Sequence, residues 1–216
     1  RSPYVKQAGA PPAPGISFVS LWAPRIAGVE ALVHSVFGVL RAAWARPDVL
    51  HIHAIGPAIV APLARMCGLR VVVTHHVLNY ENEKWGPLGR VLLRLGERLG
   101  MRWANGRIAV SPSLAALMRG TYAVPVAFIP NGIEPPRRPA RTGLLARYGL
   151  APGRYALTVA RIDPQKRQRD LIEAFGKTGA RGWKLALVGG ADYSSAYAQE
   201  VARAAEAAEN VVLLGH

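Results

Sequence analysis

The chain has 216 residues, of which 50% are hydrophobic, and its 27 Lys and Arg against 13 Asp and Glu give a net charge of +14. It contains no run of about 18 uninterrupted apolar residues, which argues against a membrane-spanning helix. The single cysteine, Cys67, excludes an intrachain disulfide and predicts a reducing, cytoplasmic location. The first residues lack the apolar segment of a signal peptide, and a start at Arg1 indicates a processed or incomplete chain.

The excess of basic residues leaves several kinds of partner open. Such a charge suits contact with nucleic acid, with an anionic membrane surface or with phosphorylated small molecules. A plainer interpretation is that an arginine-rich composition simply makes the surface basic. The charge alone does not choose among these alternatives.

Short apolar runs alternate with helical patterns along the chain. We predict strands at residues 16–20, 49–53, 70–74, 107–110, 126–129, 155–160, 184–188 and 211–214. We predict helices near residues 26–45, 57–66, 87–103, 112–119, 142–148, 165–177 and 194–208. Short strands that are apolar throughout are typical of parallel sheets covered on both faces. Their alternation with helices predicts an α/β fold.

A break in this alternation divides the chain near residue 130. Asn131 and Gly132 tolerate left-handed backbone angles and favour a sharp turn. Residues 134–139 then form a proline-rich connector without a hydrophobic period. We therefore predict two Rossmann-like, doubly wound domains with parallel sheets, residues 1–130 and residues 131–216, and we expect both to be incomplete.

The strongest local signal for a binding site follows the strand predicted at 155–160. Arg161 ends this strand, Asp163 is a predicted N-cap, and Lys166 falls in the first turn of the next helix. A cation is unfavourable there because the helix dipole is already positive. A bound phosphate would reverse that penalty, since backbone N–H groups, Arg161 and Lys166 could all converge on it. The alternative is a solvated basic helix start, because Arg167 lies in the same turn.

Histidines end two successive strands of the first predicted domain. His51 and His53 are two residues apart and point to one face of their strand. We predict no metal site, because no cysteine, third histidine or nearby acid completes it. His75 and His76 end the next strand, so His53 and His76 could line one cleft at the carboxyl ends of parallel strands. The alternative is that these histidines are structural and hydrogen-bonded.

The segment from residue 159 to residue 166 resembles the donor-site motif of glycosyltransferase family 4, a family with the GT-B fold. That motif has an arginine, four further residues and a lysine, usually followed by glycine. Arg161 and Lys166 match it, whereas Arg167 replaces the glycine. The resemblance implies that both cations bind the diphosphate of a nucleotide sugar. It also implies that residues 1–130 form the acceptor side and residues 131–216 bind the donor.

Further segments resemble the family in order and spacing. Residues 129–134 resemble its interdomain switch, where aspartate is more usual at position 134, and residues 109–111 resemble its strand-to-helix turn. Residues 187–190 resemble a strand that runs into a glycine turn, where a ligand can approach the backbone, although an ordinary tight turn is the alternative. The implied donor-cleft residues are Ser111, Asn131, Gly132, Glu134, Gly189 and Gly190.

In the family, a histidine at the end of the strand that matches residues 70–74 faces the donor sugar or the acceptor. His76 matches this position best and is the catalytic candidate. Lys84, Trp85 and the glycine after them resemble a subgroup that builds bacterial surface polysaccharides, and some of its relatives transfer rhamnose. The residues implied on the acceptor side are His53, His75, Lys84 and Trp85.

The resemblance implies the retaining transfer of a hexosyl group, including rhamnosyl, from a nucleotide-diphosphate sugar to a saccharide or lipid-linked acceptor. It implies no metal and no cofactor besides the donor. The family's opening strand with its Gly-rich loop and its later glutamate pair are not found, so we expect this segment alone to be inactive. A non-catalytic donor- or partner-binding fragment is one alternative. A basic nucleic-acid-binding protein is another, although no recognisable binding module supports it.

The predicted helix at 87–103 is amphipathic. Its apolar residues form one stripe, and arginines recur every fourth residue. Such a helix can lie on an anionic membrane, which would place the protein at the inner face of the membrane. Alternatively, the helix packs on the sheet and its basic face is solvated. The stripe comprises Leu88, Val91, Leu92, Leu95 and Leu99, and the arginines are Arg90, Arg94, Arg98 and Arg102.

Overall fold

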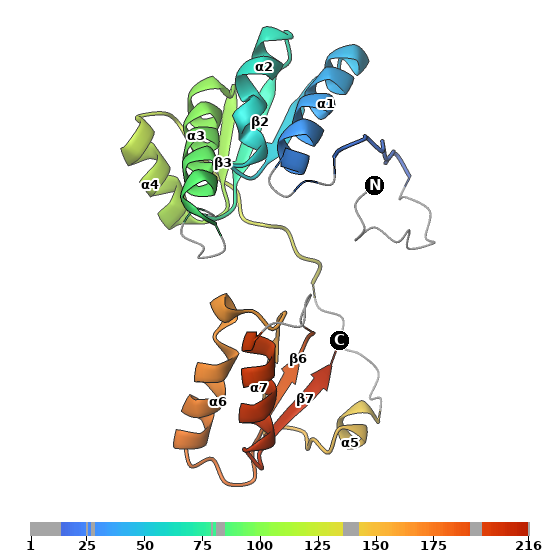
Figure 1. Cartoon of the computed structure of the whole chain (residues 1–216), viewed down its shortest axis with the longest axis vertical. Helices are drawn as coiled ribbons and strands as arrows, with labels where there is room; N and C mark the ends of the chain where they lie inside the picture. The colour runs from blue at the N-terminus through green and yellow to red at the C-terminus, as the bar shows by residue number, and fades with distance from the viewer. Residues whose placement is uncertain are drawn as a thin grey trace. The chain divides into compact units, whose positions relative to one another are not determined.

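The computed structural model describes residues 14–24, 26, 29–78, 80, 85–135, 143–190 and 196–215. The chain divides into two compact units, residues 1–134 and residues 135–216 (Figure 1). Each unit is built on a sheet of parallel strands connected by helices, so the predicted α/β class is confirmed. Within the described ranges, no helix is long and apolar enough to span a bilayer.

The first unit contains a four-stranded parallel sheet in the order β1-β2-β3-β4. The prediction of a strand at residues 16–20 is wrong, because this exposed segment pairs with no strand in the described part of the chain. The elements are α1 (Val29–Ala45), β1 (Leu50–His53), η1 (Pro57–Val60), α2 (Ala61–Met66), β2 (Val71–His75), α3 (Pro87–Trp103), β3 (Gly106–Ala109), α4 (Pro112–Tyr122) and β4 (Ala127–Phe128).

Helix α3 packs through small residues against η1 and the segment before it. A Cβ added at Gly96 would lie 2.2 Å from the carbonyl oxygen of Ile55, and one added at Gly100 would lie 2.8 Å from the Cβ of Ala58. Only glycine allows so close an approach of helix and backbone. The inward face of α3 therefore consists of Leu93, Gly96, Glu97, Gly100 and Met101.

This packing leaves the predicted leucine stripe of α3 on the outside. Leu88 is 73% exposed and Val91 is 59% exposed, and Leu92 and Leu95 are exposed as well. The alternative of a helix packed on the sheet with a solvated basic face is confirmed, but α3 packs through its glycine face and not through the leucine stripe. The physical reason is that glycines on the opposite face let the helix approach the backbone of Ile55 and the Cβ of Ala58 in η1 more closely than leucines could.

Replacing Gly96 with alanine is expected to lower the free energy of unfolding by about 1–3 kcal/mol, because the added methyl group collides with the Ile55 carbonyl. Gly120 in α4 is a matched control, since a Cβ there meets no atom within 4 Å. Gly120→Ala should instead raise the free energy of unfolding by about 0.5–1 kcal/mol through helix propensity. Urea midpoints measure both effects, and equal effects at the two sites would contradict the packing of α3.

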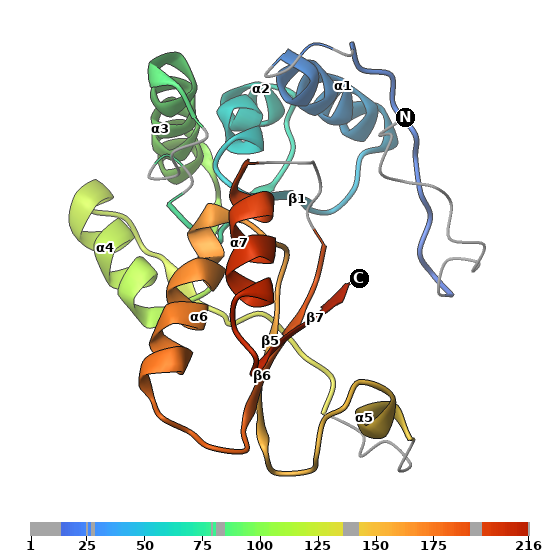
Figure 2. The ribbon, with the colours of Figure 1, turned by 60° about the horizontal axis from the view of Figure 1, so that its bottom comes forward.

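The second unit contains a three-stranded parallel sheet in the order β5-β6-β7. Helices α6 and α7 lie side by side next to this sheet (Figure 2), with Ile172 and Val201 packed against Leu185 and Leu187 of β6. The elements are α5 (Leu144–Arg147), β5 (Tyr155–Val159), η3 (Pro164–Lys166), α6 (Gln168–Lys177), β6 (Lys184–Val188), α7 (Ala196–Glu206) and β7 (Val211–Gly215).

Candidate functional site

The loop after β5 carries the two predicted phosphate-binding cations. Arg161 and Lys166 are both exposed, and the Asp163 carboxylate caps the intervening 3-10 turn by accepting a hydrogen bond from the amide of Gln165 at 3.0 Å. Arg167 then adopts a left-handed conformation with φ 52° and ψ 37°. Lys166 consequently lies in this 3-10 turn and not in the first turn of α6 as predicted, because a left-handed residue cannot continue a right-handed helix.

The left-handed backbone at Arg167 gives a physical reason for the glycine that is usual there in the resembled motif. The Arg167 guanidinium pairs with the Asp170 carboxylate, but both side chains are exposed and such pairs contribute little. We expect Arg167→Gly to be more stable than Arg167→Ala by about 0.5–1 kcal/mol, since both variants lose the ion pair and only alanine keeps a Cβ in this conformation. Thermal unfolding of the two variants measures the difference. An alanine variant that is the more stable of the two would contradict the backbone assignment.

The glycine turn after β6 lies directly beside Arg161. The amide of Ala160 donates to the carbonyl of Val188 at 2.9 Å, and the amide of Ile162 donates to the carbonyl of Gly190 at 3.0 Å. Gly189 has φ 141°, and a Cβ on it would lie 2.0 Å from the carbonyl oxygen of Ala160. The two predicted segments of the second unit therefore meet at the carboxyl edge of its sheet, in a contact that only glycine permits.

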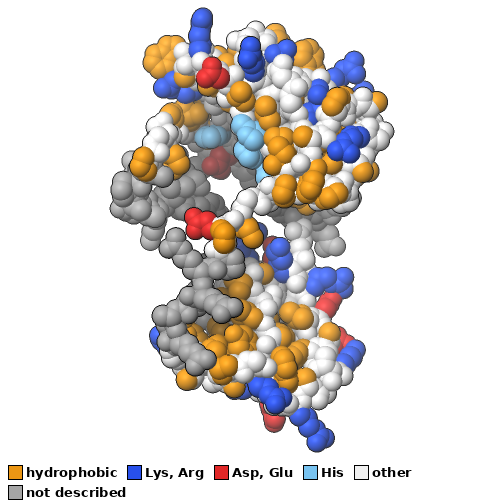
Figure 3. Space-filling model, turned by 180° about the vertical axis from the view of Figure 1, so that it is seen from behind, with side chains coloured by type: hydrophobic (Ala, Val, Ile, Leu, Met, Phe, Trp, Pro, Cys, Tyr) orange, Lys and Arg blue, Asp and Glu red, His pale blue; other side chains and the backbone are white. Residues whose placement is uncertain are grey.

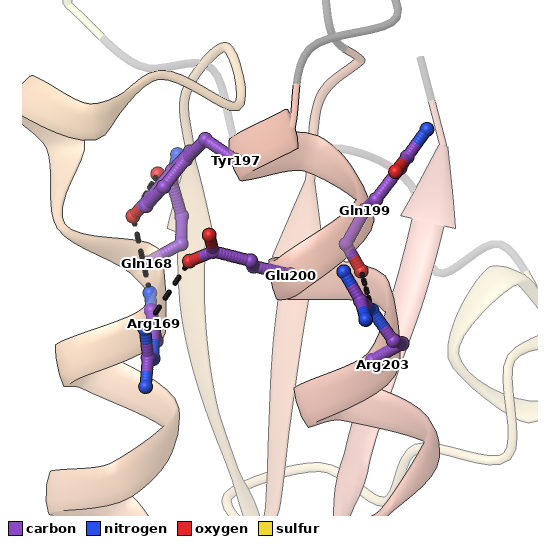
Figure 4. A network of polar contacts seen from close by, with 6 residues as sticks. All are labelled: Gln168, Arg169, Tyr197, Gln199, Glu200 and Arg203. Carbon is purple, nitrogen blue, oxygen red and sulfur yellow. Dashed lines mark hydrogen bonds and ion pairs between the residues drawn. The ribbon is translucent and has the colours of Figure 1, made fainter.

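A buried glutamine, absent from the predicted site, also contacts this loop. Gln168 is only 2% exposed, and its side-chain Nε2 donates to the carbonyl of Arg161 at 2.6 Å. Its Oε1 accepts from the hydroxyl of Tyr197 at 3.4 Å, which links the loop to α7 (Figure 4). The sequence carried a signal for it: Gln168 continues the inward spacing of Ile172 and Phe175 on α6.

In the first unit, the strand ends bring three histidines together. The Nδ1 atom of His53 and the Nε2 atom of His76 are 3.1 Å apart, within hydrogen-bonding distance. The rings of His51 and His53 are tilted by 33° with centroids 4.2 Å apart, and those of His53 and His76 are stacked with centroids 5.4 Å apart. Histidine side chains are visible on this unit in Figure 3. The structure thus places His53 beside His76 and adds His51, whose Nε2 lies 2.7 Å from Thr74 Oγ1.

Mutual proximity affects the protonation of these histidines. Burial lowers the pKa of His76, and the nearby His53 and His75 lower it further. Burial likewise lowers the pKa of His51, with smaller effects from His53 and His76. Neutral imidazoles are therefore favoured at these two positions near neutral pH, where a neutral ring can both donate and accept a hydrogen bond. Such a ring can orient a hydroxyl or accept its proton.

His75 occupies a different environment from its neighbour His76. Its side chain is 0% exposed, and its Nε2 lies 2.8 Å from Oε2 of Glu97, which is itself buried in α3. The hydroxyl of Tyr122 donates to the other oxygen of Glu97 at 2.6 Å. The prediction that His75 lies on the acceptor side is wrong in this unit, because His75 belongs to a buried network and does not reach the surface.

The remaining predicted residues have simpler surroundings. The Oγ atom of Ser111 caps α4 by accepting from the amide of Leu114 at 3.2 Å. The ring of Trp85 covers the first turn of α3, where a Cβ on Gly89 would lie 3.0 Å from it. Lys84 lies outside the described residues. The described residues bring together no group of three His, Cys, Asp or Glu side chains that could hold a metal ion. Asn131, Gly132 and Glu134 are exposed at the end of the first unit.

Comparisons with solved structures reveal the same fold at low identity. Sucrose-phosphate synthase from Thermosynechococcus elongatus matches with a TM-score of 0.66 and 19% identity over 87% of this chain and 50% of its own. A variant of S. aureus TarM in complex with fondaparinux, alpha-GlcNAc-glycerol and UDP has a TM-score of 0.56 and 14% identity, over 84% of this chain and 36% of its own. UDP-N-acetylglucosamine 2-epimerase from Rickettsia bellii has a TM-score of 0.53 and 8% identity, over 89% and 52%.

These similarities concern the fold alone, because the sequence identities are low. The chain spans 50% of the length of sucrose-phosphate synthase and 36% of the length of TarM. No curated protein matches the sequence. The model of glycosyltransferase family 4, in contrast, matches residues 6–137, more than half of the chain. This match covers the strand ends that carry His53 and His76, and it confirms the predicted family. The chain therefore belongs to glycosyltransferase family 4.

Proposed function

We propose that the whole protein transfers a hexosyl group, such as rhamnosyl, from a nucleotide-diphosphate sugar to a saccharide or lipid-linked acceptor, with retention of configuration, in the synthesis of a surface polysaccharide. The observation that carries this proposal is the loop of Arg161 and Lys166 at the carboxyl end of β5. The loop presents two cations beside a glycine turn. The UDP in the TarM complex supports a nucleotide donor.

The chemistry follows from the charge that develops when the glycosidic bond to the diphosphate breaks. Negative charge accumulates on the leaving phosphate, and positively charged donors fixed near it lower the barrier. Arg161 offers planar paired donors, and Lys166 offers a point charge. Gly189 and Gly190 would let the diphosphate approach the backbone without meeting side chains. Because the two cations would supply the positive charge, the proposal requires no metal ion.

On the first unit, we assign His76 to the transferred sugar or the acceptor hydroxyl. Its lowered pKa favours a neutral ring that can accept a proton from a hydroxyl group. His53, 3.1 Å away, would orient that ring through the hydrogen bond between them. This assignment places acceptor chemistry on the strand ends of the sheet β1-β4 and donor binding on the loop after β5.

Titration of the protein with UDP, GDP and ADP by calorimetry tests the donor assignment. We expect saturable binding of at least one of these nucleoside diphosphates. The heat of nucleotide binding should disappear when pyrophosphate competes for the same loop. Absence of binding for all three would overturn the proposal. Tight, salt-dependent binding of DNA or RNA in its place would favour the nucleic-acid alternative. Sugar transfer catalysed by this polypeptide would reject the non-catalytic alternative.

We further propose that α3 contacts an anionic membrane surface through its outward face. Leu88, Val91, Leu92 and Leu95 are exposed there, and the arginines at positions 90, 94, 98 and 102 are exposed on the same helix. The single acidic residue of α3, Glu97, is buried and does not offset this charge. Exposed leucines beside arginines suit the boundary between acyl chains and phosphate headgroups.

Sedimentation with lipid vesicles tests this contact. We expect binding to vesicles of phosphatidylcholine mixed with phosphatidylglycerol and much weaker binding to phosphatidylcholine alone, because the arginines require anionic headgroups. Val91→Ser combined with Leu95→Ser should reduce binding, whereas Leu117→Ser on α4, also an exposed leucine, should not. Equal binding by both variants would reject α3 as the contact surface.

A further inference from the structure

Gln168 uses both ends of its side-chain amide on one short piece of backbone. Its Nε2 donates to the carbonyl of Arg161 at 2.6 Å, and its Oε1 accepts from the amide of Asp163 at 3.4 Å. The two contacts flank Ile162, so the buried side chain bridges the loop as a neighbouring strand would. A residue 2% exposed at the first position of a helix needs such partners, because burying an unpaired amide is costly.

A second set of contacts holds Gln168 itself. The hydroxyl of Tyr197 donates to Gln168 Oε1 at 3.4 Å and accepts from the amide of Arg169 at 3.2 Å (Figure 4). The side chain of Arg169 also pairs with Glu200 at 3.2 Å. Both Tyr197 and Glu200 belong to α7, so the first turn of α6 is tied to the neighbouring helix. These contacts with α7 hold Gln168 in place, so its side chain can hold the loop in turn.

The loop is held from its other side by the glycine turn. Ile162 donates its amide to Gly190 at 3.0 Å, and Gly189 allows the contact with Ala160. The backbone from Arg161 to Asp163 is thus bonded to the glycine turn after β6 on one side and to Gln168 on the other. A guanidinium on a flexible side chain binds an anion best when its own Cα is fixed, since less freedom is lost on binding.

We propose that Gln168 is a positioning residue that holds Arg161 in the conformation that binds the donor diphosphate. This inference rests on the proposed donor site, and it explains how the loop that carries Arg161 is held in one conformation. An amide suits the position because the loop needs a donor and an acceptor at once. A carboxylate of the same length accepts hydrogen bonds only, so it cannot bond to the carbonyl of Arg161 unless it is protonated.

Gln168→Glu tests the inference through its pH dependence. At neutral pH we expect the variant to bind UDP about tenfold more weakly than the unmodified protein, the equivalent of one lost hydrogen bond. As the pH falls and the buried carboxyl becomes protonated, the ratio of the two affinities should return toward one, because a protonated carboxyl donates again. Gln199→Glu, at an exposed position on α7, is the matched control and should bind UDP as the unmodified protein does at every pH.

Amide hydrogen exchange separates this inference from the donor assignment. The amide of Asp163 should exchange faster in Gln168→Met, which offers it no acceptor, than in the unmodified protein or in Gln199→Glu, whether or not UDP binds. Unchanged exchange together with unchanged UDP affinity would overturn the positioning role. Failure of the unmodified protein to bind UDP, with altered exchange, would overturn the donor site alone. If Gln168→Glu does not fold, Gln168→Met removes both hydrogen bonds without burying a charge and is measured in the same way.

Discussion

Replacing Arg161 and Lys166 together with alanine should weaken the binding of UDP by about 100- to 10,000-fold. Each hydrogen bond between a cation and a phosphate contributes about 1.5–3 kcal/mol. Two such bonds contribute about 3–6 kcal/mol to the binding free energy. Since about 1.4 kcal/mol changes the affinity tenfold, this range corresponds to the expected loss. Calorimetric titration measures the loss. Both side chains are exposed, so the double variant should keep the stability of the unmodified protein.

The basic surface of the protein makes a charge-matched control necessary. Lys177 and Arg181 are exposed at the opposite end of α6, and replacing both with alanine removes the same charge. We expect this control to bind UDP within about twofold of the unmodified protein, since charges farther away than a Debye length are screened. An equal loss in the two double variants would mean that the net charge attracts UDP without a defined site.

Replacing Glu97 with alanine is expected to lower the free energy of unfolding by about 3–5 kcal/mol. The carboxylate is 3% exposed and bonds to His75 on one oxygen and to Tyr122 on the other. Its removal leaves the buried His75 and the half-buried Tyr122 without that bond and opens a cavity beside the packed glycine face of α3. Urea denaturation followed by circular dichroism measures the change. An effect below about 1 kcal/mol would show that the network contributes little to the fold.

The same network predicts how stability depends on acid. Burial alone raises the pKa of Glu97, but hydrogen bonds from His75 and Tyr122 outweigh it and leave the pKa below its ordinary value of 4.5. A lowered folded-state pKa stabilises the protein above the unfolded-state pKa, and this contribution is lost as the pH falls below about 4.5. Glu97→Gln cannot titrate, so its stability should fall less between pH 5 and pH 3 than that of the unmodified protein. If the stabilities of the two proteins fell equally between pH 5 and pH 3, the assignment of the lowered pKa to this network would be wrong.

Much of the fold and part of the candidate site could be predicted from residue order. The alternation of apolar strands with helices predicted two sets of parallel strands, and seven of the strands form at or near their predicted positions. The carboxyl ends of parallel strands share an edge, so a residue that ends a strand is placed by its position in the sequence. This reasoning predicted that His53 lies near His76 and that Arg161 follows the strand β5, and the structure has both arrangements.

The sequence by itself therefore determined the α/β class, the family and the strand ends, because strand period and motif spacing are local properties of the chain. Tertiary structure alone decided which of two adjacent histidines is buried, since β2 is covered on both faces and alternation cannot say which face holds Glu97. It decided which face of α3 is outermost, because close packing at Gly96 outweighs the hydrophobicity of the leucine stripe. It also revealed Gln168, whose two hydrogen bonds join backbone groups that only the folded loop brings within reach of one side chain.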